Sequence, residues 1–216
     1  MIRSPRPAGF TLIEMITVIA VIIILVSLVL AVNGLVQRKA AMARAGIEIQ
    51  TLSSGCEAYK TDNGGYPQDT STSGSLTSSL DPRTSYTPNS YYQACGVLYT
   101  ALSGMTNVGG VLKQTATNYA PDFFKSARLA GGPGSSNPGL GTYLMDPWGN
   151  SYGYSTAGLE LQQEYQAALV TNPQAKMPTQ NTFGTIGYNA TFDLWSTGGT
   201  TGMNGSLDTA KWVKNW

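Results

Sequence analysis

A long uncharged stretch near the N-terminus limits what this chain can fold into more than any other feature. From Met15 to Gln37 no residue is ionisable, and within Met15 to Val32 only Thr17 and Ser27 are polar. Folded as a helix, these 18 residues would extend about 27 Å, close to the ~30 Å hydrocarbon core of a bilayer. We therefore expect a helix that spans a membrane over residues up to about 37.

The remaining composition excludes several classes of function. The 216 residues include 13 Lys+Arg and 12 Asp+Glu, and this balance gives no electrostatic basis for nucleic-acid binding. The absence of histidine removes Ser-His-Asp and Cys-His catalysis and His-ligated zinc. Two cysteines cannot form a four-cysteine zinc site. Because the sequence also lacks a constellation of acid, base and nucleophile, we expect a protein that is not an enzyme.

The residues around the apolar stretch leave three interpretations open: a secretory signal peptide, a membrane anchor, or a more specialised signal. Arg3 and Arg6 supply a basic segment, and residues 29–31 could serve as a small-residue cleavage site. However, the stretch is longer than the apolar region of an ordinary signal peptide. Glu14 lies at its edge, where a carboxylate costs roughly 2–3 kcal/mol in lipid, so Glu14 is a functional candidate.

The six residues Gly-Phe-Thr-Leu-Ile-Glu, from Gly9 to Glu14, follow the basic leader and precede the apolar helix. They resemble the cleavage and methylation signal of type IV prepilins and type II secretion pseudopilins. The resemblance implies that a prepilin peptidase removes the leader, residues 1–9, by cutting between Gly9 and Phe10, and that Phe10 becomes N-methylated. It also implies an assembly role for Glu14. The leader would be cytoplasmic and the C-terminal domain periplasmic, with one pass through the inner membrane.

The predicted helix continues beyond the apolar stretch. After Arg38, apolar residues recur at intervals of 3, 4, 3, 4 and 3, the pattern of one buried helix face. These residues are Met42, Ala45, Ile49, Leu52, Cys56 and Tyr59. The run Asn63-Gly64-Gly65 then ends the pattern. One helix is therefore expected over residues 10–61, and its exit resembles that of secretion pseudopilins.

Beyond the helix we expect a globular domain over residues 62–216. The expected fold class is α+β and pilin-like, with the long N-terminal helix packed on a small antiparallel sheet. Helical spacing predicts further helices over residues 91–103, 121–130 and 159–170, and strict alternation over residues 185–194 predicts the clearest strand. The Ser/Thr-rich residues 68–90 predict a surface loop. Compared with the pseudopilin pattern, insertions lie at about 68–142 and 156–182.

Two later segments extend the resemblance. The run Asp146-Pro-Trp-Gly-Asn150 is similar to the turn that leads into the sheet of major, G-type pseudopilins. The run from Asp193 to Gly202, together with the terminal Lys214-Asn-Trp216, resembles the closing loop of calcium-binding members. This resemblance implies Asp193 and Asp208 as calcium ligands. Calcium requires six to eight oxygen ligands, so two carboxylates make a weak site. The alternative is a metal-free loop held by tryptophan packing.

The two cysteines also leave two possibilities. Cys56 lies on the predicted buried helix face, and Cys95 lies on the apolar face of the next predicted helix. Outside the inner membrane a disulfide between them could persist and would stabilise the fold by about 2–4 kcal/mol. Alternatively, both are buried thiols that pack as small apolar side chains.

The resemblance implies a structural subunit of a pilus-like filament, most similar to the major pseudopilin of type II protein secretion. Its implied partners are copies of itself, a prepilin peptidase, and an inner-membrane assembly platform with its ATPase. The nearest alternative is a type IV pilin for adhesion, motility or DNA uptake. A membrane-anchored extracytoplasmic enzyme is a less favoured third hypothesis. No cofactor other than calcium is implied.

Overall fold

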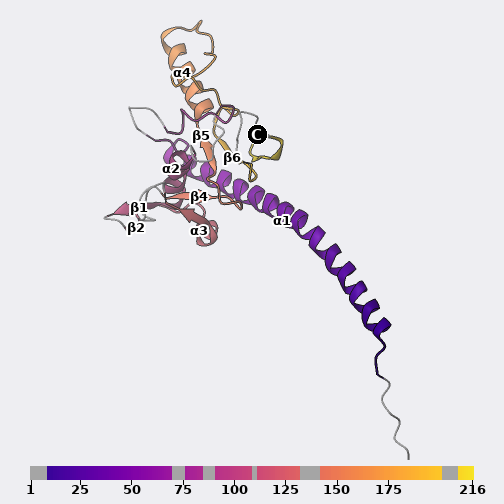
Figure 1. Ribbon diagram of the computed structural model, residues 1–216. Coiled ribbons are helices and arrows are strands. Elements are labelled where there is room, and N and C mark those ends of the chain that lie inside the picture. Colours follow the sequence, from indigo (N-terminus) through magenta and orange to yellow (C-terminus); the bar gives the residue numbers. More distant parts are fainter. Residues whose placement is uncertain (1–8, 70–75, 85–90, 109–110, 132–141, 201–208) are drawn as a thin grey trace, which may run out of the picture. The chain divides into compact units, whose positions relative to one another are not determined.

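The computed structural model describes residues 9–69, 76–84, 91–108, 111–131, 142–200 and 209–216, without the side chains of residues 29–33. The chain divides into two compact units, residues 1–41 and residues 42–216. Helix α1, Leu12–Asn63, contributes to both units, and we describe each unit by itself (Figure 1).

Helix α1 confirms the predicted long N-terminal helix, with small shifts at its ends. It has 52 residues, begins at Leu12 and ends at Asn63. The N–H group of Gly64 donates a hydrogen bond to the carbonyl of Lys60 at 2.8 Å, and Gly64 has a φ of 77°. A left-handed glycine directly after the last turn is a common way to end a helix, because it satisfies a carbonyl that has no helical partner.

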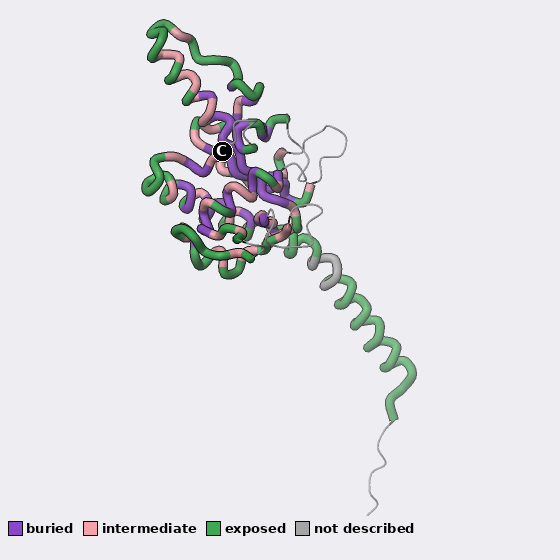
Figure 2. The backbone as a smooth tube through the Cα atoms, turned by 90° about the vertical axis from the view of Figure 1, so that its left-hand side faces the viewer, coloured by how far each residue is buried: buried purple, intermediate pink, exposed green. Residues whose placement is uncertain are grey.

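In the first unit, the large apolar residues of α1 whose burial is described are exposed, and Figure 2 shows this part of the backbone in green. Among the described residues, no helix is both long enough and apolar enough to count as a membrane span. The predicted span from Met15 to Val32 ends within residues 29–33, whose side chains the structure does not describe. The expected transmembrane segment is therefore not supported by the structure.

The second unit has a core built on the predicted apolar stripe of α1. Ala45, Leu52 and Cys56 have no exposed surface. Leu52 and Cys56 share one core with residues of helix α2, Tyr92–Ser103, and of three short strands, and this core includes Cys95, Leu98, Leu102, Leu144, Tyr152, Tyr154 and Leu194. The periodicity of the sequence thus predicted the correct buried face, because a helix with one apolar stripe must cover it.

The sheets are antiparallel and small, which confirms the α+β class but divides the expected single sheet into three. The paired strands are β1 (Met105–Val108) with β2 (Val111–Gln114), β3 (Arg128–Ala130) with β4 (Tyr143–Met145), and β5 (Gly153–Ser155) with β6 (Asp193–Ser196) and then β7 (Val213–Lys214). A single helical turn, η2 (Thr209–Lys211), precedes β7.

The predicted helix over residues 121–130 is only partly correct. Helix α3 covers Pro121–Ser126, and Ala127 adopts an extended conformation with φ −63° and ψ 142°. Residues Arg128–Ala130 instead form β3, which pairs with β4. Strand pairing with a distant segment therefore overrides the local helical pattern, as tertiary contacts commonly do.

The prediction of a strand over residues 185–194 is wrong for most of its length. Only Asp193 and Leu194 belong to β6. Upstream, the N–H groups of Tyr188 and Asn189 donate to the carboxylate of Asp193, and Gly187 has a φ of 70°. These backbone groups bind a side chain instead of a neighbouring strand, so the alternating pattern does not produce a ladder.

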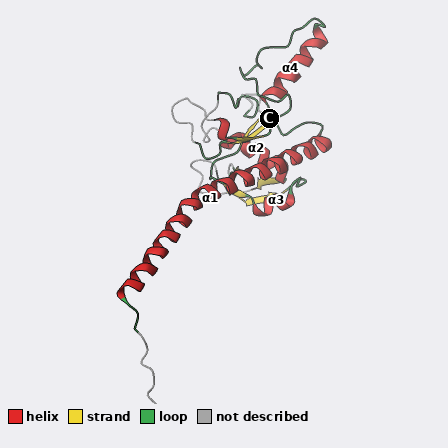
Figure 3. Cartoon of the chain, turned by 90° about the vertical axis from the view of Figure 1, so that its right-hand side faces the viewer, coloured by secondary structure: helices red, strands yellow, loops and turns green. Residues whose placement is uncertain are grey.

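The described residues of the predicted surface loop, 68–90, form turns with no helix or strand, as expected, but part of this segment is buried and not at the surface. Thr77 and Ser78 are fully buried. The Ser78 carbonyl accepts hydrogen bonds from the Asn181 amide and the Thr185 hydroxyl. The N–H group of Thr156, directly before helix α4 (Ala157–Thr171), donates to the Thr77 carbonyl at 3.0 Å. Helix α4 confirms the predicted helix over residues 159–170 and extends outward as an arm (Figure 3).

Candidate functional site

The predicted cleavage point lies in exposed, non-helical backbone. Gly9 and Phe10 precede the first residue of α1, and the Phe10 side chain is 82% exposed. A Cβ atom placed on Gly9 would meet no other atom within 4 Å. Proteases cut exposed, irregular backbone of this kind. No described residue covers the Gly9–Phe10 bond, so a peptidase can reach it.

Glu14 and Thr11 together form the start of helix α1. The Thr11 N–H and the Thr11 hydroxyl both donate to Glu14 Oε2 at 2.8 Å, and the Glu14 N–H approaches Thr11 Oγ1 at 3.4 Å. This reciprocal arrangement is a capping box, which satisfies backbone N–H groups that the first helical turn leaves without partners. The negative charge also lies in the first turn, where the helix dipole favours it.

The capping role of Thr11 was missed in the sequence analysis, although the spacing Thr11-Leu12-Ile13-Glu14 carries it. Cleavage after Gly9 would leave this box intact, because the Thr11 N–H belongs to the Phe10–Thr11 peptide bond. Glu14 Oε1 accepts no hydrogen bond within the part of the chain that the structure describes. The carboxylate can therefore cap its own helix and still accept one external donor.

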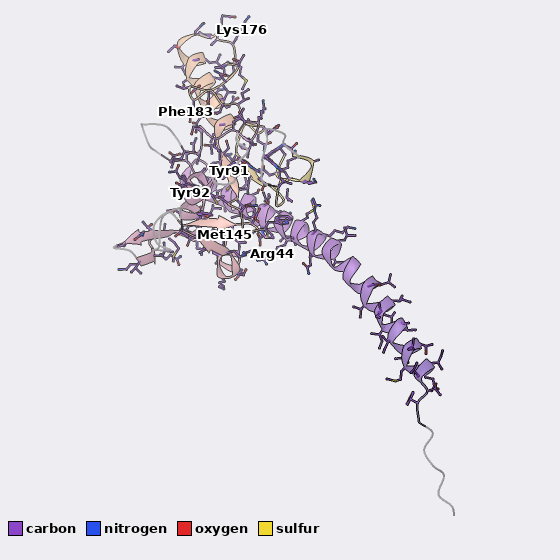
Figure 4. All side chains as sticks on the ribbon, in the orientation of Figure 1. Arg44, Tyr91, Tyr92, Met145, Lys176 and Phe183 are labelled. Atoms are coloured by element: carbon purple, nitrogen blue, oxygen red, sulfur yellow. The ribbon has the colours of Figure 1, made fainter. Side chains whose placement is uncertain are left out.

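The helix after Glu14 offers an almost purely apolar surface. From Leu12 to Leu28 the large apolar side chains are between 50% and 77% exposed, and Figure 4 shows side chains projecting all around this part of α1. The polar side chains within the stretch do not interrupt that surface. The Thr17 hydroxyl donates to the Glu14 carbonyl at 2.9 Å, and the Ser27 hydroxyl donates to the Ile24 carbonyl at 2.7 Å. A helix that is apolar on all sides needs an apolar environment.

Residues 5–30 match the family described as the prokaryotic N-terminal methylation motif. The match contains Gly9, Phe10 and Glu14, and it supports a relationship to the type IV pilin-like prepilins. It indicates processing by a prepilin peptidase, membrane anchoring and assembly into a filament. The motif is common to pseudopilins and pilins, so it does not distinguish them. No curated protein and no solved structure matches the chain.

Of the two predicted calcium ligands, the structure describes Asp193 alone. Asp193 is 1% exposed, and its two carboxylate oxygens accept hydrogen bonds from Tyr188 N at 2.7 Å and Asn189 N at 2.9 Å. Asp208 lies outside the described residues. No group of three or more candidate metal-binding side chains occurs among the residues that are described. The calcium site stays a prediction.

Burial raises the pKa of Asp193 to about 6, although the two backbone N–H donors act in the opposite direction. The nearby Asp81 adds to the rise, and Arg83 lowers the pKa. Asp81 is itself buried and accepts hydrogen bonds from the N–H groups of Arg83 and Ile186. Both carboxylates therefore hold the loop before β6 in place.

The turn from Asp146 to Asn150 lies between β4 and β5 and is held by the buried carboxylate of Asp146. Asp146 is fully buried and accepts hydrogen bonds from Trp148 N at 3.0 Å, Asn150 N at 2.9 Å and the Ser196 hydroxyl at 2.6 Å. Burial raises the pKa of Asp146. The first two bonds shape the turn and the third connects it to β6, so the role of this segment is structural.

The two cysteines are free and fully buried in the core of the second unit, so the disulfide is not present in this structure. Cys95 Sγ donates to the Leu144 carbonyl at 3.5 Å. Burial raises the pKa of Cys95 to about 11 and raises that of Cys56 further. Because the thiolate is the reactive form, both thiols are expected to be inert and to pack as small apolar groups.

Proposed function

We propose that this chain is a structural subunit of a pilus-like filament and that it most resembles the major pseudopilin of type II protein secretion. One observation carries the proposal: an accessible processing signal stands directly before a helix whose apolar side chains are exposed on every side. Burying one such side chain contributes roughly 1.5–3 kcal/mol. Over the length of this helix, the gain from covering it is large.

Two surroundings can cover such a helix: lipid, and the same helix of neighbouring subunits. We propose that the inner membrane holds the subunit first and that assembly then moves the helix into a filament core. In this proposal the leader faces the cytoplasm and residues 42–216 face the periplasm. An external ATPase and an inner-membrane platform supply the work of extraction.

Three observations favour a structural role without catalysis. The sequence contains no histidine. The buried carboxylates of Asp81, Asp146 and Asp193 accept hydrogen bonds from backbone N–H groups. The buried cysteines have raised pKa values. The groups that a catalyst would use therefore maintain loops or pack in the core.

The preference for a pseudopilin over a type IV pilin rests on two features. The Asp146–Asn150 segment, which resembles the G-type pseudopilin turn, lies immediately before the three-stranded sheet. In addition, Cys56 and Cys95 are buried in the first two helices, whereas a cysteine pair near the C-terminus is what the resemblance to pilins would favour.

Mass spectrometry of the purified membrane-associated protein tests the filament proposal. The expected N-terminal peptide begins at Phe10 and carries one methyl group on its amine. Sheared material from overexpressing cells should contain the same processed chain in filaments. A mature chain that begins at Val32 would indicate ordinary signal-peptide cleavage and would overturn the proposal.

Deleting the gene distinguishes the pseudopilin from the pilin. Loss of export of a folded protein, with surface pili unchanged, is the result expected for a secretion pseudopilin. Loss of surface pili, adhesion or motility with normal export would assign the chain to the pilins instead.

A further inference from the structure

A large open cleft in the second unit has no role in the filament proposal. Its volume is about 680 Å³, and its walls come from the end of α1, from α2, and from β1 and β2. Ligand sites in proteins commonly have volumes of this order and combine aromatic side chains with a few polar groups. The residues that line this cleft fit that description.

Three tyrosines provide the aromatic surface of the cleft: Tyr59, Tyr92 and Tyr99. Tyr92, on α2, is labelled in Figure 4. Each ring also contacts a second aromatic ring. The ring centroids lie 5.4 Å apart for Tyr59 and Tyr119, 6.0 Å for Tyr92 and Tyr143, and 5.7 Å for Tyr99 and Phe124.

These neighbours restrict the tyrosine rings before any ligand arrives. A side chain that is already ordered loses little further freedom on binding, so less of the interaction energy is spent on ordering the site. The aromatic surface of the cleft is therefore preorganised.

Three neutral polar groups of the cleft are able to form hydrogen bonds with a ligand. The side-chain amides of Gln68 and Gln93 and the hydroxyl of Tyr92 make no hydrogen bond within the described chain. An amide offers both a donor and an acceptor, and so does a phenol. These groups can therefore pair with ligand hydroxyls in either direction.

Charge is almost absent from the cleft. Among the described residues that line it, there is no Lys, Arg or His, and Asp69 is the one carboxylate. The Asp69 oxygens accept hydrogen bonds from Leu76 N at 2.7 Å and Thr77 N at 3.0 Å. Nothing in the lining pairs with a phosphate or a carboxylate, and the single acidic group is occupied by backbone donors. The cleft therefore suits an uncharged ligand.

We propose that this cleft binds a neutral saccharide. A sugar ring has an apolar face of C–H groups, which packs on a tyrosine ring, and a rim of hydroxyls, which both donate and accept hydrogen bonds. The cleft offers these two features together, and its single carboxylate, Asp69, is bound by backbone N–H groups. An extended neutral peptide is the competing ligand, since β1 lines the cleft and, among the described strands, pairs with β2 alone.

Saturation-transfer difference NMR tests the proposal with the full processed chain in a zwitterionic detergent. Detergents with sugar head groups are avoided because they would compete for the cleft. The probes are maltose, cellobiose and lactose, each titrated to millimolar concentration. Glucuronic acid serves as the charged probe, and a capped Gly-Ser-Ala hexapeptide serves as the peptide probe. We expect at least one neutral disaccharide to receive saturation, and the charged sugar and the peptide to receive none.

Substitutions locate the binding. Tyr92→Ala should raise the Kd at least about tenfold, as removal of an aromatic anchor commonly does. Tyr92→Phe keeps the ring and should retain most of the affinity. Gln93→Ala should raise the Kd roughly fivefold, the effect of one lost hydrogen bond. Tyr165→Ala is the matched control, because Tyr165 lies on α4 and does not line the cleft.

Near-UV circular dichroism of each variant distinguishes loss of binding from loss of folding, because an unchanged spectrum shows that the fold is retained. The proposal is overturned if no neutral disaccharide binds. It is also overturned if binding survives Tyr92→Ala and Gln93→Ala in folded protein, or if the peptide alone binds. None of these results bears on the N-terminal processing or on filament assembly, so the two proposals fail separately.

Discussion

The two parts of helix α1 differ in whether their apolar side chains are covered by the rest of the chain. In the first unit the helix is apolar on all sides, and its large side chains are exposed. In the second unit one stripe of the same helix is buried against α2 and the strands, and the other positions are largely polar. The second unit therefore satisfies its apolar surface within one chain, whereas the first unit depends on lipid or on other subunits.

The largest effect is expected from removing a core side chain from the second unit. Leu52 has no exposed surface, so Leu52→Ala should lower the free energy of unfolding by about 2–5 kcal/mol. Leu25 is 57% exposed in the first unit, and Leu25→Ala should change it by less than about 0.5 kcal/mol.

Urea unfolding followed by tryptophan fluorescence provides the measurement. All four tryptophans lie in residues 42–216, so the signal reports on the second unit alone. Leu25→Ala should instead reduce the yield of sheared filaments. Equal destabilisation by the two substitutions would show that the division between the halves of α1 is wrong.

The buried carboxylate of Asp193 should make the second unit less stable as pH rises. Burial raises its pKa from 3.8 to about 6, so the folded state holds this proton more tightly than the unfolded state. The resulting stabilisation is present below about pH 4 and is lost as pH rises through 6. Its size is about 3 kcal/mol at most, since one pKa unit corresponds to about 1.4 kcal/mol.

Asp193→Asn isolates this contribution, because the amide does not titrate. The variant loses one acceptor for the N–H groups of Tyr188 and Asn189, and this costs roughly 1 kcal/mol. The difference in melting temperature between pH 4.5 and 7.5 should be smaller for the variant than for the unmodified chain. Asp146 contributes equally to both proteins and cancels in the comparison, because no interaction with Asp193 contributes to its pKa shift.

The sequence predicted correctly those segments whose residue pattern is compatible with one structure or one signal. A five-interval apolar stripe fixed the buried face of α1 from Ala45 to Cys56, and the Gly-Phe-Thr-Leu-Ile-Glu run identified the processing signal. The alternation over residues 185–194 failed, because the carboxylates of Asp81 and Asp193 capture backbone N–H groups that a strand would have used. Short-range patterns do not show which side chain will compete for the backbone.

The saccharide cleft could not have been predicted from the sequence, for a different reason. Its lining residues lie between positions 59 and 142 and come from two helices, two strands and the segments that contain Gln68, Leu76 and Thr142. No local spacing joins them. By contrast, the capping role of Thr11 could have been found, since Thr and Glu three residues apart at a helix start are a known signal.

Substitutions at the start of α1 should separate helix capping from assembly. Glu14→Ala removes both the capping acceptor and the charge, Glu14→Gln retains a capping side chain without charge, and Thr11→Ala removes the cap and keeps the charge. All three should be processed normally. Loss of the cap costs about 0.5–2 kcal/mol of helix stability, which affects only the first turn.

Filament yield after shearing, relative to processed subunit in the membrane, is the measurement. If the free Glu14 Oε1 accepts a donor from a neighbouring subunit, both Glu14 variants should assemble poorly and Thr11→Ala should assemble nearly as well as the unmodified chain. An amine about 4 Å from the carboxylate would attract it by about 4 kcal/mol at an effective dielectric of 20, although desolvation offsets much of this. Normal yield from Glu14→Gln would show that the charge is dispensable and that Glu14 acts only as a cap.

The smallest effect is expected from calcium. Binding to the folded state alone raises stability by mass action, so a functional site would raise the melting temperature in millimolar calcium. Both oxygens of Asp193 already accept a backbone hydrogen bond, from Tyr188 N and Asn189 N, so calcium would have to compete with these two donors for the carboxylate. We therefore expect less than about 1 °C of difference between calcium and chelator, well below the 2–4 °C that 1 kcal/mol produces in a chain of this size. Asp193→Asn is the matched control, because it should behave identically in both conditions. A rise in melting temperature with calcium that Asp193→Asn abolishes would instead establish the site and show that the loop before β6 rearranges to form it.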